Sequence, residues 1–445
     1  MLIRPNVVTR PGALLSVAFA FVGYAAAQSA SLTTIHEFKG VPDGANPSGP
    51  LVADSKGVLY GTTTNGGLMV SSEPYEPSGC GIVFSMTPPA AEGARWTETI
   101  LHSFTGGADG CGPGSGVVFG RNGVLYGTTS NSVDGGTAFS LTPPSAPGSP
   151  WSLTTIHTFA GGPNDAASPI FALTMGKNDV LFGAGFYGGD ICFDPSSPVP
   201  AFGCGAVFAL APPTSPGGPW TEPMVFSIGA IGDGPTSGVA IGSGGVLYGV
   251  TAYGGGAFGG PGVLYSLAPP SCQGCPWTQT MISNFTTSSG KGDGSGPGGL
   301  PIIGPQGIVF GTTNGGGLGS GEVYAVLPPS SAGGAWTYDV LYMPPSLPPL
   351  HSSGPSQLTL AKNGVLYSTI PLGGANYAGE IFSLTPPTSS GEPWTETTLF
   401  SFGGNGYSPN GGLVVGPDGR LFGTTAGGYP GSTDEGTVFI LKLSR

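Results

Sequence analysis

The sequence has few charged residues for its length, which limits the chemistry that it can support. Lysine and arginine together number 12 and aspartate and glutamate 24, so charged residues make up 8% of the 445 residues. This leaves few groups for acid, base or ion chemistry. The formal net charge of −12 argues against a nucleic-acid partner, because the affinity of such proteins comes mainly from Lys and Arg on phosphates.

Long apolar runs are also scarce, and the notable one stands near the start. Arg4 and Arg10 precede an apolar run over residues 13–27, and three alanines before Gln28 have the small-residue form of a signal-peptidase site. We therefore expect residues 1–27 to be a signal peptide and the protein to be exported to the extracellular space, the periplasm or the cell surface. A membrane anchor is the weaker interpretation, because about 20 apolar residues are needed to cross a bilayer. We predict no integral membrane segment in the mature chain.

Glycine and proline, in contrast, are abundant, with 84 and 46 residues. They fall at fixed offsets between short runs of Val, Leu, Tyr and Phe, which is typical of turns in an all-β protein. The seven-residue stretch over 57–63, Gly-Val-Leu-Tyr-Gly-Thr-Thr, recurs in recognisable form to the C-terminus. The aromatic residues of its seven copies lie 55 to 66 residues apart, at Tyr60, Tyr126, Phe182, Tyr248, Phe310, Tyr367 and Phe422. Such a period predicts a repeat architecture.

Each repeat contains the pattern of four short strands. A Leu/Val run is followed by the Leu-Tyr-Gly-Thr-Thr strand, by a Gly-Thr-Val-Phe-Ser-Leu strand that usually ends in Pro-Pro, and by a strand that follows a tryptophan. The six tryptophans all occupy this position, at Trp96, Trp151, Trp220, Trp277, Trp336 and Trp394. We also expect Gly61 in the second strand to allow close approach of the neighbouring sheet.

The seventh repeat lacks its fourth strand, and a matching segment stands at the other end of the chain, over residues 32–38. Seven complete sheets form only if this N-terminal strand joins the last repeat. That arrangement closes the ring of a β-propeller, which leaves only short protected edges. We therefore predict an all-β fold in which residues 28–445 form one seven-bladed β-propeller domain of four-stranded antiparallel blades.

The strand order assigns the connections to two faces. Connections after the second and fourth strands are long and variable, and open onto one face, here called the long-loop face. Function resides more often on variable loops carried by a rigid scaffold. Aromatic and acidic side chains there suit a polysaccharide or protein ligand. For any single aromatic residue, the simpler explanation is that its ring packs the loop onto the blade. The candidate binding residues are Tyr75, Tyr187, Asp190, Tyr253, Tyr377, Tyr429 and Asp434.

Six cysteines in an exported chain favour disulfides over metal or catalytic thiols. Cys80 and Cys111 are expected on the same face, so we predict a bridge between them. Cys192 and Cys204 lie within one long loop. Cys272 and Cys275 have redox-motif spacing, but they stand in a turn without a βαβ context, which favours a structural bridge.

Metal and cofactor sites are not predicted. His36, His102 and His157 occupy the same fourth-strand position in different blades, which separates them in space and favours structural roles. Four aspartates, each followed by Gly, suit turns better than calcium coordination, because Asp accepts hydrogen bonds from nearby backbone amides. They are Asp43, Asp109, Asp233 and Asp293.

Two alternatives to a binding module stay open. The first is a secreted propeller hydrolase or lyase, because glycoside hydrolysis needs two acids about 5 to 10 Å apart and the long loops supply several acids. These acids are Glu73, Glu76, Asp190, Asp194, Asp434 and Glu435. The second alternative is a purely structural cell-surface protein.

The three tandem blocks, Leu-Tyr-Gly-Thr-Thr, Gly-Thr-Val-Phe-Ser-Leu-Thr-Pro-Pro and Trp-x-x-x-x-Leu-x-x-Phe, resemble the GloVer repeat. This repeat occurs in exported bacterial proteins called choice-of-anchor tandem repeat proteins. The resemblance extends from about Leu32 to Leu441 and implies an exported, propeller-like repeat protein. It brings no established activity and no catalytic residues.

Overall fold

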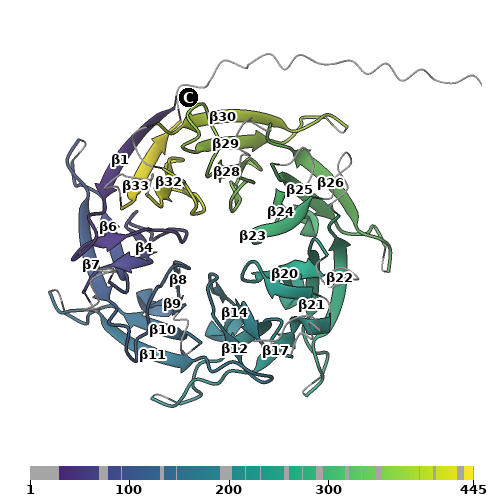
Figure 1. Cartoon of the computed structure of the whole chain (residues 1–445), viewed down its shortest axis with the longest axis horizontal. Coiled ribbons are helices and arrows are strands. Elements are labelled where there is room, and N and C mark those ends of the chain that lie inside the picture. Colours follow the sequence, from purple (N-terminus) through teal and green to yellow (C-terminus); the bar gives the residue numbers. More distant parts are fainter. Residues whose placement is uncertain are drawn as a thin grey trace, which may run out of the picture.

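Seven four-stranded antiparallel sheets are arranged as blades around a central axis in the computed structural model (Figure 1). The structure describes residues 30–69, 79–91, 93–130, 135–146, 148–190, 203–215, 217–230, 232–254, 260–272, 274–286, 294–315, 320–331, 333–345, 353–389, 391–403, 407–427 and 435–443. The expected signal peptide, residues 1–27, lies outside the described residues. In the part of the chain that is described, no helix is long and apolar enough to cross a membrane.

The order of strands within each blade confirms the predicted pattern. Blade 1 contains β3 (Val52–Ala53), β4 (Leu59–Thr63), β6 (Ile82–Thr87) and β7 (Thr97–Ser103). Blade 2 contains β8 (Val117–Phe119), β9 (Leu125–Thr129), β10 (Thr137–Thr142) and β11 (Ser152–Thr158). Blade 3 contains β13 (Thr174–Met175), β14 (Leu181–Gly185), β16 (Ala206–Leu210) and β17 (Met224–Ser227). Blade 4 contains β19 (Ala240–Ile241), β20 (Leu247–Gly254), β21 (Val263–Ala268) and β22 (Thr278–Asn284), and β18 (Gly232–Pro235) also pairs with β20.

The remaining blades repeat this order. Blade 5 contains β23 (Ser295–Ile303), β24 (Val309–Gly315), β25 (Glu322–Leu327) and β26 (Thr337–Tyr342). Blade 6 contains β27 (Thr359–Leu360), β28 (Leu366–Ile370), β29 (Glu380–Thr385) and β30 (Thr395–Ser401). Blade 7 contains β31 (Val414–Val415), β32 (Leu421–Thr425), β33 (Thr437–Lys442) and the N-terminal strand β1 (Ser31–Glu37). The predicted ring closure is therefore confirmed, because β1 pairs with β33 as the outermost strand of the last sheet.

The outer pair of strands in every blade contains a register shift that the sequence analysis did not predict. In blade 1 it falls between Val83 and Phe84, and the other six blades have it at the equivalent place. A bulge of this kind strengthens the local twist of a sheet. The shift recurs at the equivalent place because the seven blades repeat the same sequence pattern.

The expectation for Gly61 was wrong about the element that approaches it. A Cβ atom on Gly61 would lie 2.7 Å from the ring of Phe84 and 2.7 Å from Leu51, both of which belong to its own blade. Phe84 is the partner of Gly61 across the β4–β6 pair. Glycine is needed because the aromatic ring of the third strand folds over the second strand, and Gly127 with Phe139 repeats the arrangement.

The tryptophans join neighbouring blades. Each indole contacts the aromatic ring of the second strand in the preceding blade, with centroid distances from 5.6 to 6.5 Å. The six pairs are Tyr60 with Trp151, Tyr126 with Trp220, Phe182 with Trp277, Tyr248 with Trp336, Phe310 with Trp394, and Phe422 with Trp96. Tyr367 is the seventh such aromatic, and Ala30 beside the closing strand packs in the same cluster.

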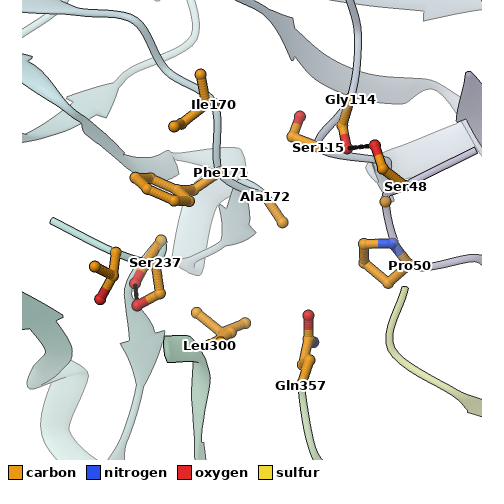
Figure 2. Close-up of a pocket in the computed structure, with 14 residues that line it drawn as sticks. Ser48, Pro50, Gly114, Ser115, Ile170, Phe171, Ala172, Ser237, Leu300 and Gln357 are labelled. Carbon is orange, nitrogen blue, oxygen red and sulfur yellow. Dashed lines mark hydrogen bonds between the residues drawn. The ribbon is translucent and has the colours of Figure 1, made fainter. Parts of the chain in front are cut away.

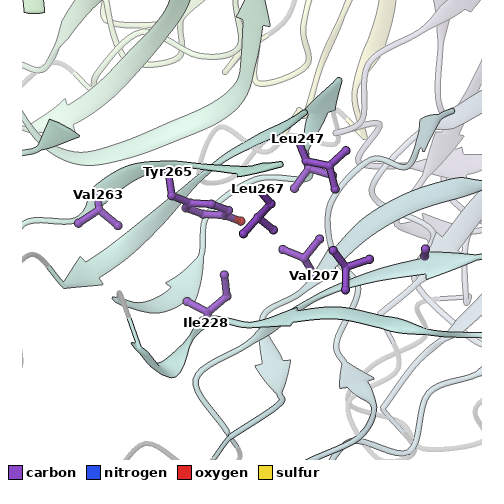
Figure 3. Packing of buried hydrophobic residues seen from close by; sticks show 9 residues of the cluster. Val207, Ile228, Leu247, Val263, Tyr265 and Leu267 are labelled. Carbon is purple, nitrogen blue, oxygen red and sulfur yellow. The ribbon is translucent and has the colours of Figure 1, made fainter. Parts of the chain in front are cut away.

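The hydrophobic core is divided into seven clusters that lie between blades. Figure 3 shows one of them, in which Val207 of blade 3 packs against Leu247, Tyr265 and Leu267 of blade 4. Within the described ranges, five short 3-10 turns connect strands, and four of them lie between the first two strands of a blade. They are η1 (Arg121–Gly123), η2 (Lys177–Asp179), η3 (Ile228–Ala230), η4 (Ser243–Gly245) and η5 (Pro305–Gly307).

Two short antiparallel strand pairs join connections of the long-loop face. β2 (Gly44–Ala45) pairs with β5 (Asn65–Gly66), and β12 (Ala166–Ala167) pairs with β15 (Tyr187–Gly188). In each case a connection that leaves a fourth strand pairs with the loop that leaves a second strand. The loops that follow the second strands of blades 1 and 3 are therefore held by backbone hydrogen bonds to a neighbouring connection.

Candidate functional site

Exposed apolar side chains gather on the long-loop face. Among the described residues, ten large hydrophobic side chains are exposed, and seven of them stand in connections that open onto this face. These seven are Leu68, Met69, Ile170, Tyr187, Tyr253, Met343 and Leu372. Of the others, Ile100 and Met281 lie on outermost strands, and Leu327 lies at the opposite face. The seven side chains of the long-loop face are spread over the loops of several blades, on the face where variable loops make an interaction site most expected.

Four of the predicted binding residues can be placed in the structure. Tyr187 and Asp190 share the long loop of blade 3, where the Tyr187 ring packs edge-on against Phe186 at 4.9 Å. The backbone N–H of Asp190 donates to the Ser227 hydroxyl at 2.7 Å. Tyr253, which is 51% exposed, stands at the end of β20 in blade 4. Tyr377 lies in the loop of blade 6 with a φ of 55°, so these residues are spread over three blades.

The other three predicted binding residues, Tyr75, Tyr429 and Asp434, lie outside the described residues. The same holds for Asp293 and for three of the acids considered for hydrolysis, which are Glu73, Glu76 and Asp194.

A pocket opens where the connections leading into the innermost strands meet around the axis (Figure 2). Its cavity volume is about 160 Å³. Five connections and strand β23, which come from six successive repeats, line this axial pocket, with Ser48, Gly49, Pro50, Gly114, Ser115, Ile170, Phe171, Ala172, Thr236, Ser237, Gly238, Gly299, Leu300 and Gln357. Sequence reasoning missed it, because its residues are mostly small and neutral and come from six different repeats.

Hydroxyl groups fix the geometry of the axial pocket. Ser48 donates to the carbonyl of Gly114 at 3.1 Å, and Thr236 donates to the carbonyl of Pro297 at 2.6 Å. The first bond links the connections that precede blades 1 and 2, and the second links the connection before β19 to the innermost strand β23 of blade 5. The pocket is therefore held by bonds between repeats, while its lining presents hydroxyls, one amide and apolar surface, with no ionisable side chain among the lining residues.

Of the two described disulfides, Cys80–Cys111 lies at the long-loop face, whereas Cys272–Cys275 lies in the turn between β21 and β22 at the opposite face. Cys80 and Cys111 form the predicted bridge, with an S–S distance of 2.13 Å, and join the loop of blade 1 to the following connection. Cys272 and Cys275 are also bridged, as predicted. Cys204 is disulfide-bonded as well, and Cys192, the other cysteine of its loop, lies outside the described residues.

Ionisable side chains gather at two junctions between blades, in groups here called the junction clusters. The first contains His36 of β1, Asp43 of the following connection and Glu98 of β7 in the next blade. His36 Nε2 lies 3.4 Å from Asp43 Oδ2 and 3.8 Å from Glu98 Oε2. Burial raises the pKa of Glu98 to about 7, although the charge of His36 opposes the rise.

The second junction cluster has the same composition, with His157, Asp165 and Glu222. His157 Nε2 lies 3.4 Å from Asp165 Oδ1 and 3.6 Å from Glu222 Oε2. The Glu222 side chain is only 6% exposed. Burial and the charge of Asp165 raise the pKa of Glu222 to about 8. Burial would raise the pKa of Asp165 too, but hydrogen bonds from His157 and from the backbone of Ala160 lower it.

The histidines lie in three different blades, as the sequence analysis inferred, but each one has an aspartate partner that it did not foresee. Asp43 and Asp109 accept hydrogen bonds from nearby backbone amides, as predicted for turns, and also contact His36 and His102. Glu98 and Glu222 were missed. Each glutamate stands two residues after the tryptophan of its own repeat. Each contacts a histidine of the preceding repeat, and that histidine stands six residues after the position that corresponds to the tryptophan.

Comparison with solved structures finds propellers of low similarity. A putative oxidoreductase (glucose dehydrogenase) from Thermus thermophilus is 17% identical, over 73% of this chain and 95% of that one, with a TM-score of 0.42. A putative 6-phosphogluconolactonase from Bacteroides uniformis is 15% identical, over 77% and 84%, with a TM-score of 0.45. A protein of unknown function from Dyadobacter fermentans is 12% identical, over 93% and 99%, with a TM-score of 0.45. At these scores the likenesses carry no argument about activity.

Comparison with curated proteins finds no match. The sequence profile of the Gloeobacter/Verrucomicrobia repeat matches residues 69–324, which is more than half of the chain. The matched repeats form successive blades of the ring. The chain belongs to the Gloeobacter/Verrucomicrobia repeat family.

Proposed function

We propose that this protein is an exported binding module that holds a neutral polysaccharide in the axial pocket of its long-loop face. The observation that carries the proposal is the lining of that pocket. It combines hydroxyls, the amide of Gln357 and the apolar surfaces of Phe171 and Leu300, without an ionisable side chain. Apolar walls with a few polar groups that fix orientation are the usual composition of a site for an uncharged ligand.

The size of the axial pocket suits one unit of a longer ligand. Pockets for whole small molecules usually measure about 300 to 1,000 Å³, whereas this cavity measures about 160 Å³. The rest of a chain would lie over the exposed apolar residues of the long-loop face, among which Tyr187 and Tyr253 offer rings for stacking. The formal net charge of −12 disfavours an acidic polysaccharide.

The chemistry of the pocket favours binding over hydrolysis. Glycoside hydrolysis uses two carboxyl groups that flank the scissile bond, and the residues that line the axial pocket supply none. The junction clusters do contain paired carboxyl groups, but they recur at two equivalent junctions. Such repetition fits a property of the repeat better than it fits a single catalytic centre.

The test is a microarray of neutral and acidic glycans, probed with purified protein that comprises residues 28–445. We expect binding to one class of neutral glycan and none to acidic glycans. Turnover of a labelled polysaccharide without retention on any surface would contradict the proposal and favour the enzyme alternative. Retention of a protein from the same environment, with no signal on any glycan, would also contradict it.

Tyr253→Ala and Met281→Ala form a matched pair for the same array. Both residues are exposed and belong to blade 4, but Tyr253 lies on the long-loop face and Met281 on the outermost strand. We expect the signal to fall with Tyr253→Ala and to persist with Met281→Ala. Equal effects of the two variants would argue against binding through the long-loop face.

A further inference from the structure

We propose that the two junction clusters are metal sites, each of which takes one divalent first-row transition ion such as Zn²⁺ through His36, Asp43 and Glu98 or through His157, Asp165 and Glu222. Each cluster offers one imidazole nitrogen and two carboxylate oxygens that lie within 4.8 Å of one another. This proposal is independent of the glycan proposal, because the ligands lie between blades and none of them lines the axial pocket.

Three of the four distances from an imidazole nitrogen to a carboxylate oxygen match the spacing around a small ion, and the distance from His36 to Glu98 is slightly longer. Zn²⁺ binds His nitrogen and carboxylate oxygen at about 2.0 to 2.2 Å, which places two ligands of a tetrahedral ion about 3.3 to 3.6 Å apart. His36 Nε2 is 3.4 Å from Asp43 and 3.8 Å from Glu98, and His157 Nε2 is 3.4 Å from Asp165 and 3.6 Å from Glu222. Three protein ligands leave the fourth position to water.

The ligand set selects against calcium and magnesium. Ca²⁺ takes about 6 to 8 oxygen ligands, and Mg²⁺ is usually held by one or two carboxylates with several waters. Imidazole nitrogen suits Zn, Cu, Fe and Ni. The histidine in each cluster therefore points to a transition ion.

Buried polar atoms without partners supply a second observation. Among the described residues, eight buried side-chain nitrogen or oxygen atoms have no hydrogen-bond partner, and four of them belong to the junction clusters. These four are His36 Nε2, Asp43 Oδ1, Glu98 Oε1 and Glu222 Oε1. The Glu222 side chain is 6% exposed, so water does not readily satisfy its free oxygen. Leaving a buried polar group unpaired costs free energy, and a bound ion removes that cost.

Metal binding requires the imidazole of each cluster to be neutral and both carboxyl groups to be ionised, so the ion displaces any proton that the buried glutamate holds. Without a cation, two ionised carboxylates would carry two negative charges in a half-buried place, and burial of unpaired charge is unfavourable. The side chain of the nearby Lys39 is 67% exposed, and its ammonium group pairs with Glu37 at 2.9 Å. A divalent ion would neutralise the two carboxylates from within.

A third junction provides a natural comparison. His102 lies 3.2 Å from Asp109, but Leu153 stands where the other two junctions have glutamate. There the Thr105 hydroxyl donates to Asp109 Oδ1 at 2.6 Å. The equivalent positions of the two complete clusters are Lys39 and Ala160, which offer no hydroxyl. Where the third ligand is missing, the protein thus satisfies the aspartate internally.

The test is isothermal titration of EDTA-treated, tag-free protein with ZnCl₂ at about pH 7.5, with CaCl₂ in parallel. We expect two Zn²⁺ ions per chain and no comparable binding of Ca²⁺. Glu222→Gln should reduce the stoichiometry to one, and Glu98→Gln together with Glu222→Gln should reduce it to none. Zinc should also raise the melting temperature of the wild-type protein but not that of the double variant.

A variant that gains a third metal site keeps the test valid even if the variants that lose a site fold poorly. Leu153→Glu with Thr105→Ala rebuilds the missing ligand set beside His102 and Asp109. We expect this variant to bind three Zn²⁺ ions and to show the absorption bands of tetrahedral Co²⁺ with greater intensity than the wild type. The proposal is overturned if the wild type binds no Zn²⁺, or if the stoichiometry is the same in the wild type and in the glutamine variants.

Discussion

Leu32 of the first strand pairs with Leu441 of the last strand in antiparallel register. The two ends of the described chain therefore share one sheet, and the ring is held closed by hydrogen bonds between them. Phe38, which follows β1, is only 1% exposed and packs in the cluster between blades 7 and 1. The N-terminal segment thus stabilises the closed ring in two ways, through its hydrogen bonds to β33 and through the buried side chain of Phe38.

Deletion of residues 28–40 should destabilise the whole ring. Loss of a fully buried phenylalanine alone costs about 3 to 5 kcal/mol, and the deletion also exposes the edge of β33. Thermal unfolding followed by circular dichroism is the measurement. Glu37→Ala, on the exposed side of the same strand, is the control and should leave the melting temperature nearly unchanged. An unaltered melting temperature in the deletion variant would refute ring closure.

The two described disulfides should differ in their contribution because they close loops of different length. On the chain-entropy account, Cys80–Cys111 contributes about 4 kcal/mol and Cys272–Cys275 about 2 kcal/mol, because their sequence separations are 31 and 3. Denaturant unfolding of Cys80→Ser/Cys111→Ser and of Cys272→Ser/Cys275→Ser measures the difference. A larger loss from the short loop would show that local packing outweighs chain entropy.

The contact between Tyr126 and Trp220 should couple blades 2 and 3. Their ring centroids lie 5.6 Å apart in an edge-on arrangement, and such pairs contribute about 0.5 to 1.5 kcal/mol beyond their buried area. A double-mutant cycle of Tyr126→Ala and Trp220→Ala, measured by denaturant unfolding, should give a coupling energy of about 1 kcal/mol. Tyr126→Ala with Trp336→Ala is the control, because Trp336 contacts Tyr248 instead, and it should be additive.

The stability of the protein should depend on the protonation of Glu380 in blade 6. Burial, with a further contribution from the charge of Glu396, raises the pKa of Glu380 to about 7 from its ordinary value of 4.5. Burial also raises the pKa of the neighbouring Glu396 and of Tyr342. Because the folded state holds the proton more tightly than the unfolded state, the stability due to this proton is complete below about pH 4.5 and is lost as the pH rises through about 7.

Glu380→Gln should therefore reduce the fall in melting temperature between about pH 5 and pH 8.5, measured in EDTA so that the junction clusters are metal-free. The difference between the variant and the wild type should be largest at the high end of this range. Glu37→Gln, at an exposed position, is the matched control and should follow the wild-type curve. Parallel curves for Glu380→Gln and the wild type would contradict the raised pKa.

Much of the fold could be predicted because the signals are local and repeated. The missing tryptophan strand of the last repeat and the matching residues 32–38 were enough to infer ring closure, since each repeat is one sheet. The reason for Gly61 was predicted wrongly, because sequence spacing does not tell whether the ring that covers it comes from its own blade or from the next. The bulge beside Phe84 left no local signal at all.

The candidate site was only partly predictable, because its residues meet across repeats. Tyr187 and Tyr253 were proposed as binding residues because aromatic residues stand out in variable loops, and they stay predictions. Glu98 and Glu222 were missed, because each contacts a histidine of the preceding repeat. Each glutamate is therefore far along the chain from its histidine. The axial pocket is built largely from glycines, serines and prolines, which in a sequence with 84 glycines and 46 prolines cannot be distinguished from ordinary turns.

The most direct test of the account is the affinity of a neutral glycan, identified on the array, for a variant in which the axial pocket is filled. Leu300→Trp places a large side chain where Leu300 lines the opening (Figure 2), while Leu327→Trp adds the same bulk at the opposite face. We predict that Leu300→Trp weakens binding at least about tenfold, which corresponds to about 1.4 kcal/mol, and that Leu327→Trp leaves the affinity unchanged. Wild-type affinity in a correctly folded Leu300→Trp protein would contradict the assignment of the axial pocket.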